Sequence, residues 1–388
     1  MRLDFRLPAR LQAESRGGSR RAGVTLVELL IVVSIIILML AVAVPRLRPM
    51  MESRRVREAS RAVNAYFAAA RNRAMETGRP VGVLIERLQR QPEAAVMLRM
   101  AEIPPPYAGD TTTARVQVRI LAGTPSVLQI RFPSPGEVAQ ISGGFLPVYV
   151  GDPIRLNYRD PPFRLLGPDT DGDGKVNCEV IQSGQPLIAS IPNTIGRLPY
   201  PIVTDPAAPW NVPASASLPM PFSIDRRPET TAAAPLRLPG RTVIDLAASG
   251  TDTMLTAAPP AGPAFQPIDK DGDNTNGVQD DSPVVIMFGP EGSVDRIYYQ
   301  SIERRVTEPI FLLIGRWDRM PAIAGSGTPM ADDGLFNWQD IQNLWVVVNA
   351  NSGLTTAAPV VAPSGGGVPA DVAEARDYAR HFLGTGGR

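Results

Sequence analysis

Two acidic loops carry the side chains of this chain that are best suited to hold a metal ion. In the first loop the candidate ligands alternate along nine residues: Asp169, Asp171, Asp173 and Asn177. Carboxylates at alternate positions converge on one cation, and Gly174 allows the sharp turn of a calcium loop. The twelfth position is Val180, where a bidentate acid belongs, so Glu179 or another loop must supply that ligand.

The second loop comes closer to a full ligand set. Its candidates are Asp269, Asp271, Asp273, the backbone carbonyl of Thr275, and Asp280 at the twelfth position. Oxygen-only ligands favour Ca²⁺ over zinc or copper. We expect a structural Ca²⁺ that cross-links the loop. The alternative is a pair of solvated acidic turns, because Asp, Asn and Gly favour turns for their own reasons.

The other side chains that could take part in catalysis do not form a pattern that predicts enzymatic activity. Cys178 and His381 are the single cysteine and the single histidine, so no internal disulfide forms and a Cys–His nucleophile is not indicated. No Ser/His/Asp set, phosphate-binding glycine loop or pair of catalytic carboxylates stands out. The net charge is +1, and the excess of basic residues lies in residues 1–23. The rest of the chain therefore has no excess of positive charge that would indicate nucleic-acid binding.

One acid, Glu28, lies inside an apolar run from Val24 to Val44. A charge at membrane depth is costly and needs a physical reason. The run has 21 residues and spans about 32 Å as a helix, which predicts a transmembrane segment with its arginine-rich flank in the cytoplasm. Gly23, the candidate cleavage site, precedes the apolar run. An ordinary secretory signal differs in both respects, because its apolar segment is shorter and the cleavage site follows it. Pro45 follows the run.

This spacing of Gly23, Glu28 and Pro45 resembles the N-terminal motif of type IV pilins and type II secretion pseudopilins. The resemblance covers about the first 50 residues. It implies that a prepilin peptidase cuts after Gly23 and methylates Val24, a position where the family usually has Phe or Met. It also implies that Glu28 offsets the terminal amine of a neighbouring subunit during assembly. Paired opposite charges in a low dielectric cost less than isolated ones.

The elements that position these residues are predicted to form an α+β, pilin-like fold with a long N-terminal helix on an antiparallel β-sheet head. Residues 1–23 form the cleaved leader, 24–45 the transmembrane and filament-core helix, and 46–78 the helix that packs on the head. Apolar residues at three- and four-residue spacing mark the packing face: Val56, Ala59, Val63, Tyr66, Phe67, Ala70 and Ala74. Gly78 and Pro80 end the helix.

Strand patterns and loops divide the head. Period-two alternation places the first β part in 79–160. Residues 161–283, rich in Pro and Gly, are predicted to form a large loop-rich insertion that holds both acidic loops. Late strands fill 284–357, and their hairpin at Val284–Val294 resembles those of H-type minor pseudopilins. Residues 358–388 form an Ala/Pro/Gly-rich tail with a short C-terminal helix.

The resemblance implies a structural subunit, a minor pseudopilin most like the H type, of a type II secretion-type periplasmic filament. Its expected location is the inner membrane, crossed once, with the N-terminus in the cytoplasm and the head in the periplasm, followed by the filament. Its expected partners are a prepilin peptidase, other pseudopilins or pilins, and the inner-membrane assembly platform. The alternatives are a minor type IV pilin for adhesion or DNA uptake, and a membrane-anchored binding or enzyme domain that merely uses this leader.

Overall fold

The structure of this chain is a computed structural model. It describes residues 25–169, 175–191, 198–252, 265, 282–299, 302–320, 329–331, 333–361 and 368–384. The chain divides into two compact units, Met1–Met51 and Glu52–Arg388, and each unit is described by itself.

Helix α1, Leu26–Thr77, begins in the first unit and ends in the second. Within the second unit its buried face carries most of the residues at which the sequence predicts a packing stripe: Val56, Ala59, Val63, Phe67, Ala70 and Ala74. The helix ends at Gly78, whose backbone N–H donates to the Ala74 carbonyl at 3.0 Å and whose φ is +65°. Only glycine adopts that conformation without strain, so the chain turns here.

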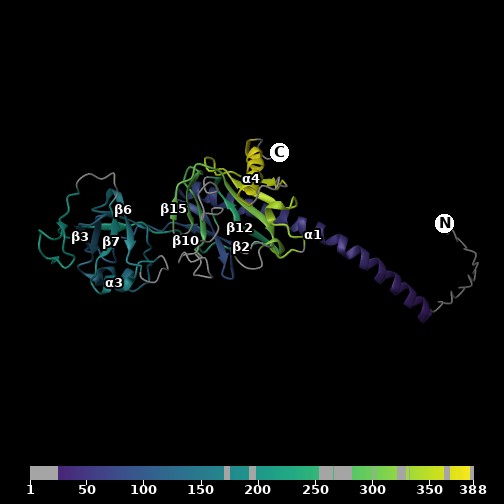
Figure 1. The fold of residues 1–388 in the computed structure, drawn as a ribbon, viewed down its shortest axis with the longest axis horizontal. Coiled ribbons are helices and arrows are strands. Elements are labelled where there is room, and N and C mark those ends of the chain that lie inside the picture. The colour runs from purple at the N-terminus through teal and green to yellow at the C-terminus, as the bar shows by residue number, and fades with distance from the viewer. Residues whose placement is uncertain are drawn as a thin grey trace, which may run out of the picture. The chain divides into compact units, whose positions relative to one another are not determined.

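The described strands form a larger sheet of 11 strands and a smaller sheet of seven (Figure 1). The larger sheet is antiparallel and has the order β15-β14-β13-β1-β2-β12-β16-β17-β18, with β10 and β11 also paired to β2. Its strands are β1 Val81–Leu88, β2 Gln91–Glu102, β10 Glu229–Thr230, β11 Leu236–Arg237, β12 Thr242–Gly250, β13 Val284–Phe288, β14 Val294–Tyr299, β15 Ile302–Arg304, β16 Ile310–Arg316, β17 Leu344–Val348 and β18 Thr355–Pro359.

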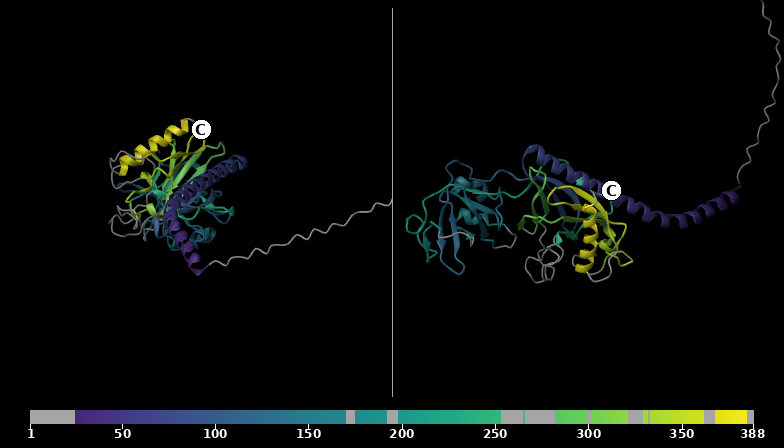
Figure 2. Two further views of the ribbon diagram at one scale, coloured as in Figure 1. Left: turned by 90° about the vertical axis from the view of Figure 1, so that its right-hand side faces the viewer. Right: turned by 90° about the horizontal axis from the view of Figure 1, so that it is seen from above.

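Alternation along the strands gives the larger sheet two buried faces. Leu312 and Val346 face α1 in one core, whereas their neighbours Phe311 and Trp345 pack with α4, Val368–Gly384, in another. Figure 2 shows α4 lying along the sheet near the C-terminus. Arg376 of α4 is fully buried and donates to the carbonyls of Thr251 and Ala248, and burial lowers its pKa to about 9.

The smaller sheet has the order β8-β3-β4-β7-β6-β5-β9. Its strands are β3 Gln117–Leu121, β4 Val127–Arg131, β5 Pro153–Leu156, β6 Arg159–Gly167, β7 Leu187–Ser190, β8 Ile202–Val203 and β9 Phe222–Ile224. Short helices join them: η1 Pro135–Val138, α2 Ala139–Ser142 and α3 Cys178–Gln182. Two further 3-10 helices, η3 Trp317–Arg319 and η4 Asn337–Gln339, belong to the larger sheet's loops.

The smaller sheet forms a module inserted into the larger one between β2 and β10. We call residues 107–224 the inserted module and residues 103–106 and 225–228 its two connectors. The connectors run antiparallel, because Glu102 pairs with Glu229 at one end and Tyr107 with Ile224 at the other. The module has its own hydrophobic core, which shares no described residue with the core beneath α1. It is therefore a second packing unit within the head.

The predicted fold class, a pilin-like α+β fold, is wrong. The described part of the chain is mainly β, built on sheets of 11 and seven strands, and it is not a pilin-like α+β head with one loop-rich insertion. The inserted module spans 107–224 rather than 161–283, and β12 within the predicted insertion belongs to the larger sheet. Short strands such as β7 depend on cross-strand partners distant in sequence, so local composition conceals them.

Candidate functional site

Glu28 closes a hydrogen-bonded cap at the start of α1. The Glu28 backbone N–H donates to Thr25 Oγ1 at 3.2 Å, and the Thr25 backbone N–H donates to Glu28 Oε2 at 3.4 Å. This reciprocal pair is a capping box, which satisfies two of the N–H groups left open at a helix start. The carboxylate also lies at the positive end of the helix dipole. The Thr25-x-x-Glu28 spacing is the local sequence signal of this box.

The N-terminal part of α1 is apolar on all sides and exposed within this chain. Its large apolar side chains are 44–79% exposed: Leu26, Val27, Leu29, Leu30, Ile31, Val32, Val33, Ile35, Ile36, Ile37, Leu38, Met39 and Leu40. A helix that is apolar all round is normally buried. An exposed apolar surface of this extent therefore marks a place where other molecules bind.

The prediction of a transmembrane helix at 24–45 is corrected by the structure. Among the residues that it describes, no helix is both long enough and apolar enough to cross a membrane. The predicted single-pass inner-membrane location, with its cytoplasmic N-terminus and periplasmic head, is contradicted by the same finding.

The other predicted processing and assembly positions are only partly described. Gly23 and Val24 lie outside the described residues. Pro45 lies within α1, whose helical backbone continues through this position. Glu28 and Pro45 are therefore placed on one helix, and the cleavage site remains a prediction from sequence.

The predicted calcium ligands also lie largely outside the described residues, namely Asp171, Asp173, Asp269, Asp271, Asp273, Thr275 and Asp280. Among the residues that are described, no group of three or more His, Cys, Asp or Glu side chains could hold a metal ion. The described ends of the first loop lie close together, because the Asn177 backbone N–H donates to the Pro168 carbonyl at 3.0 Å. Asn177 therefore contacts the residue that precedes Asp169, and Ca²⁺ binding stays a prediction.

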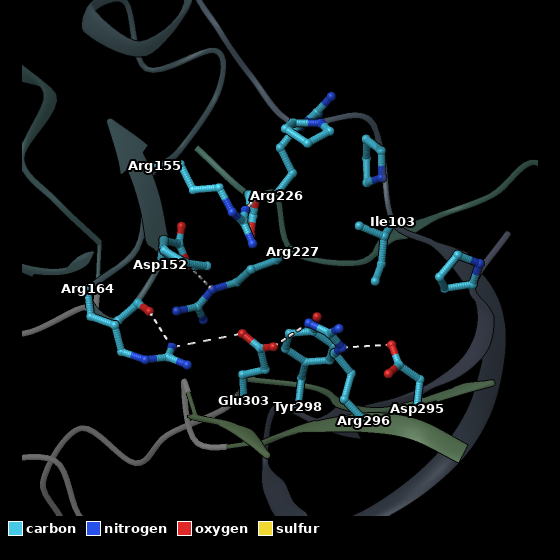
Figure 3. A pocket seen from close by; sticks show the side chains of 16 residues that line it. Ile103, Asp152, Arg155, Arg164, Arg226, Arg227, Asp295, Arg296, Tyr298 and Glu303 are labelled. Atoms are coloured by element: carbon cyan, nitrogen blue, oxygen red, sulfur yellow. Dashed lines mark hydrogen bonds and ion pairs between the residues drawn. The ribbon is translucent and has the colours of Figure 1, made fainter. Parts of the chain in front are cut away.

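A cavity of about 580 Å³ lies where the inserted module meets the larger sheet (Figure 3). Its walls come from the module, from both connectors, and from β14 and β15. The charged side chains that line it are Asp152, Arg155, Arg164, Asp225, Arg226, Arg227, Asp295, Arg296 and Glu303. Ile103, Pro104, Pro106 and Tyr298 supply apolar surface between them. We call this space the junction cavity.

Ion pairs fix most of these charges. Arg227 Nε donates to Asp152 Oδ1 at 2.8 Å, and the guanidinium carbon lies 4.1 Å from the centre of the Tyr149 ring. Arg155 pairs with Asp225. Burial of the Asp152 carboxyl raises its pKa, and this effect outweighs the opposing attraction to Arg227. The module side of the cavity is thus held in place by hydrogen-bonded charges.

On the opposite wall, Arg296 from β14 lies between two acids. It donates to Asp295 Oδ2 at 2.8 Å and pairs with Glu303 of β15. Burial alone would lower the pKa of Arg296, but its hydrogen bond to the Asp295 carboxylate and the negative charges nearby raise it overall. Burial, reinforced by Glu303, raises the pKa of the Tyr298 hydroxyl. At neutral pH the wall therefore presents the Arg296 guanidinium, paired with its two acidic neighbours, and the neutral phenol of Tyr298.

One ion pair spans the cavity. Arg164 Nη1 lies 3.9 Å from Glu303 Oε2, and the two side chains point toward each other across the space (Figure 3). The same nitrogen donates to the Gly151 carbonyl at 2.9 Å. Sequence reasoning missed the cavity, because its charged residues are spread from 152 to 303. The Asp225-Arg226-Arg227-Pro228 run, which forms one connector, was the only local signal.

The chain matches no protein-family model, no curated protein and no solved structure. Interpretation of its function therefore depends on the residues and contacts described above.

Proposed function

We propose that this chain is a structural subunit, a minor pseudopilin, of a filament of the type II secretion class. A prepilin peptidase would cut after Gly23, and α1 would then pack against the helices of neighbouring subunits. The other expected partners are further filament subunits and the assembly platform. The role is structural rather than enzymatic.

The observation that carries the proposal is the exposed, all-round apolar surface of α1 from Leu26 to Leu40. Removing apolar surface from water is favourable by about 25 cal/mol per Å², so a complex in which a partner covers this surface is stabilised. Helices of identical or related subunits supply a matching apolar surface. Glu28 is the one acid in this stretch and lies at the helix start, next to the terminus that cleavage after Gly23 would create.

The decisive experiment is the mass of the chain after co-expression with a prepilin peptidase. The expected product lacks residues 1–23 and carries one added methyl group at Val24. Gly23→Ala should leave the chain at full length, because the peptidase needs close access to the backbone at this position. Gly18→Ala, a matched change within the leader, should be processed normally. Recovery of wild-type chain with Met1 still present, or cut beyond residue 44, would refute the proposal.

A further inference from the structure

We propose that the junction cavity binds an extended peptide segment of a partner protein, one that carries both an acidic and a basic side chain. This inference does not depend on the filament function, because every residue it uses belongs to the unit Glu52–Arg388. A chain with another cellular role would retain the same site.

The size and position of the cavity are those of a ligand site. Its volume of about 580 Å³ lies within the usual range for small-ligand pockets, and such pockets form preferentially where two packing units meet. A second cavity of about 430 Å³ adjoins it. The residues that line both are Asp152, Asp225, Arg226, Arg227 and Tyr298. The two cavities share part of their walls, so a ligand longer than a compact ion, such as a peptide segment, can contact both.

The charges of the walls select the class of ligand. Five arginines and four acids line the junction cavity, so it carries both signs and a small net positive charge. A doubly charged phosphate would be drawn to the arginines but repelled by four carboxylates nearby. A peptide with both charges complements the two signs, and its apolar atoms can contact Ile103, Pro104 and Pro106.

Two arginines have donors to offer such a peptide. Arg226 Nε is buried and has no hydrogen-bond partner among the described residues, although the far end of the guanidinium pairs with Glu229. Arg164 is half exposed, and its 3.9 Å separation from Glu303 is too long for a direct hydrogen bond. A ligand carboxylate can accept from these guanidinium groups, because carboxylate oxygens match the guanidinium fork.

Binding of a ligand carboxylate to Arg164 also creates a site for the basic side chain of the peptide. When a ligand carboxylate takes the place of Glu303 beside Arg164, the Glu303 carboxylate retains Arg296 on one side and is open on the other. A lysine or arginine of the peptide can then pair with Glu303. The ion pair that spans the empty cavity is thus replaced by two pairs with the ligand, and no charge is left buried alone.

The test measures peptide binding to the purified full chain by fluorescence anisotropy. The probes are labelled hexapeptides in which one Asp and one Lys occupy every combination of positions in an alanine background. In the matching neutral peptides, Asn replaces Asp and Gln replaces Lys. At least one charged peptide should bind saturably and at least tenfold more tightly than its neutral counterpart. The double variant Arg164→Gln, Arg226→Gln should weaken that binding at least tenfold.

The control is Arg159→Gln, which removes an exposed arginine from the same strand, β6, outside both cavities. It should leave binding unchanged. The single variant Arg164→Gln loses a long ion pair and one hydrogen bond to the Gly151 carbonyl at a half-exposed position. It should lower the melting temperature by no more than a few degrees and still weaken binding. The proposal fails if no charged peptide exceeds its neutral counterpart, or if the arginine variants bind like wild type. It also fails if inorganic phosphate binds more tightly than every peptide, since that would indicate a free-anion site.

Discussion

At the scale of single residues, Glu28 has a local role that the family resemblance does not mention. Its carboxylate and the Thr25 hydroxyl cap the first turn of α1 through two reciprocal hydrogen bonds. The cap and the proposed pairing with a neighbour's amine make different demands on the side chain. A glutamine can complete a capping box, whereas only a carboxylate can offset a positive charge.

We therefore predict that Glu28→Gln and Glu28→Ala reduce incorporation into filaments to a similar extent. Incorporation is measured by co-purification of the processed chain with its partner subunits. Helix content, measured by circular dichroism, should fall slightly in Glu28→Ala alone, which loses the hydrogen bond from the Thr25 backbone N–H to the side chain of residue 28. Wild-type incorporation of Glu28→Gln would show that capping, rather than charge, is the function of this residue.

A second residue, Asp245, is predicted to make stability depend on pH. Its carboxylate is buried and accepts from the backbone N–H groups of Ala247 and Ala248 and from Asn337 Nδ2 at 3.1 Å. Burial raises its pKa to about 6. The folded state therefore binds this proton more tightly than the unfolded state does. Stability from this group is complete below about pH 4 and is lost as the pH rises through about 6.

The expected loss between pH 4 and pH 7 is about 2 kcal/mol from this one group. Chemical denaturation at the two pH values measures it. Asp245→Asn should lose less stability over this interval than wild type, since it has no proton to release. The exposed Asp377→Asn should follow the wild-type pH dependence. Equal pH dependence in Asp245→Asn and wild type would contradict the prediction.

At the scale of elements, Arg71 ties α1 to two turns of the larger sheet. Its Nε donates to the Gly292 carbonyl at 3.1 Å, in the β13–β14 turn, and to the Ser352 carbonyl at 2.9 Å, in the β17–β18 turn. Gly353 lies against this contact with a φ of +64°. A Cβ built there would lie 1.9 Å from the Gly292 carbonyl oxygen. The helix and two hairpins thus meet where no side chain fits.

Gly353→Ala should lower the free energy of unfolding by about 2–4 kcal/mol, because backbone strain adds to a steric clash. Gly334→Ala is the matched control, with a φ of +68° and open space around its Cβ. It should cost only about 1–2 kcal/mol, the strain of a left-handed backbone. Urea denaturation of both variants measures the difference. Similar losses in the two would mean that the turn moves away without penalty.

At the scale of the whole molecule, the inserted module and the larger sheet have separate cores joined by two connectors and by charged contacts. The described residues include one cysteine, Cys178, so no disulfide among them joins the two. Any stabilisation of the loops must then come from other sources. The predicted Ca²⁺ loops at 169–177 and 269–280 would provide it by cross-linking carboxylates.

We predict that Ca²⁺ raises the melting temperature of the full chain by several degrees. Ligand that binds only the folded state stabilises it by mass action. Calorimetry with added Ca²⁺ and with excess EGTA measures the shift. Asp271→Asn with Asp273→Asn should remove the contribution of the second loop and so reduce the shift. Mg²⁺, which demands a tighter octahedral shell, serves as the control cation. Identical melting curves in Ca²⁺ and EGTA would remove the hypothesis.

Local patterns determined much of the secondary structure. The spacing of Val56, Val63 and Phe67 indicated the buried face of α1, and alternation indicated the β3–β4 hairpin at Gln117–Arg131. These signals are visible in sequence because a helix or strand repeats its environment every few residues. The Gly23 and Glu28 motif is likewise local, so the processing hypothesis needed no tertiary structure.

Only the tertiary structure decided which strands share a sheet and which charges share a cavity. Alternation shows that β3 has one buried face, but it does not say that the face belongs to a separate module. Arg164 and Glu303 are 139 residues apart in the chain and meet at 3.9 Å only because the module returns to the sheet at β10. Pairing between distant strands depends on the whole chain, and a pattern that repeats every two or four residues cannot encode it.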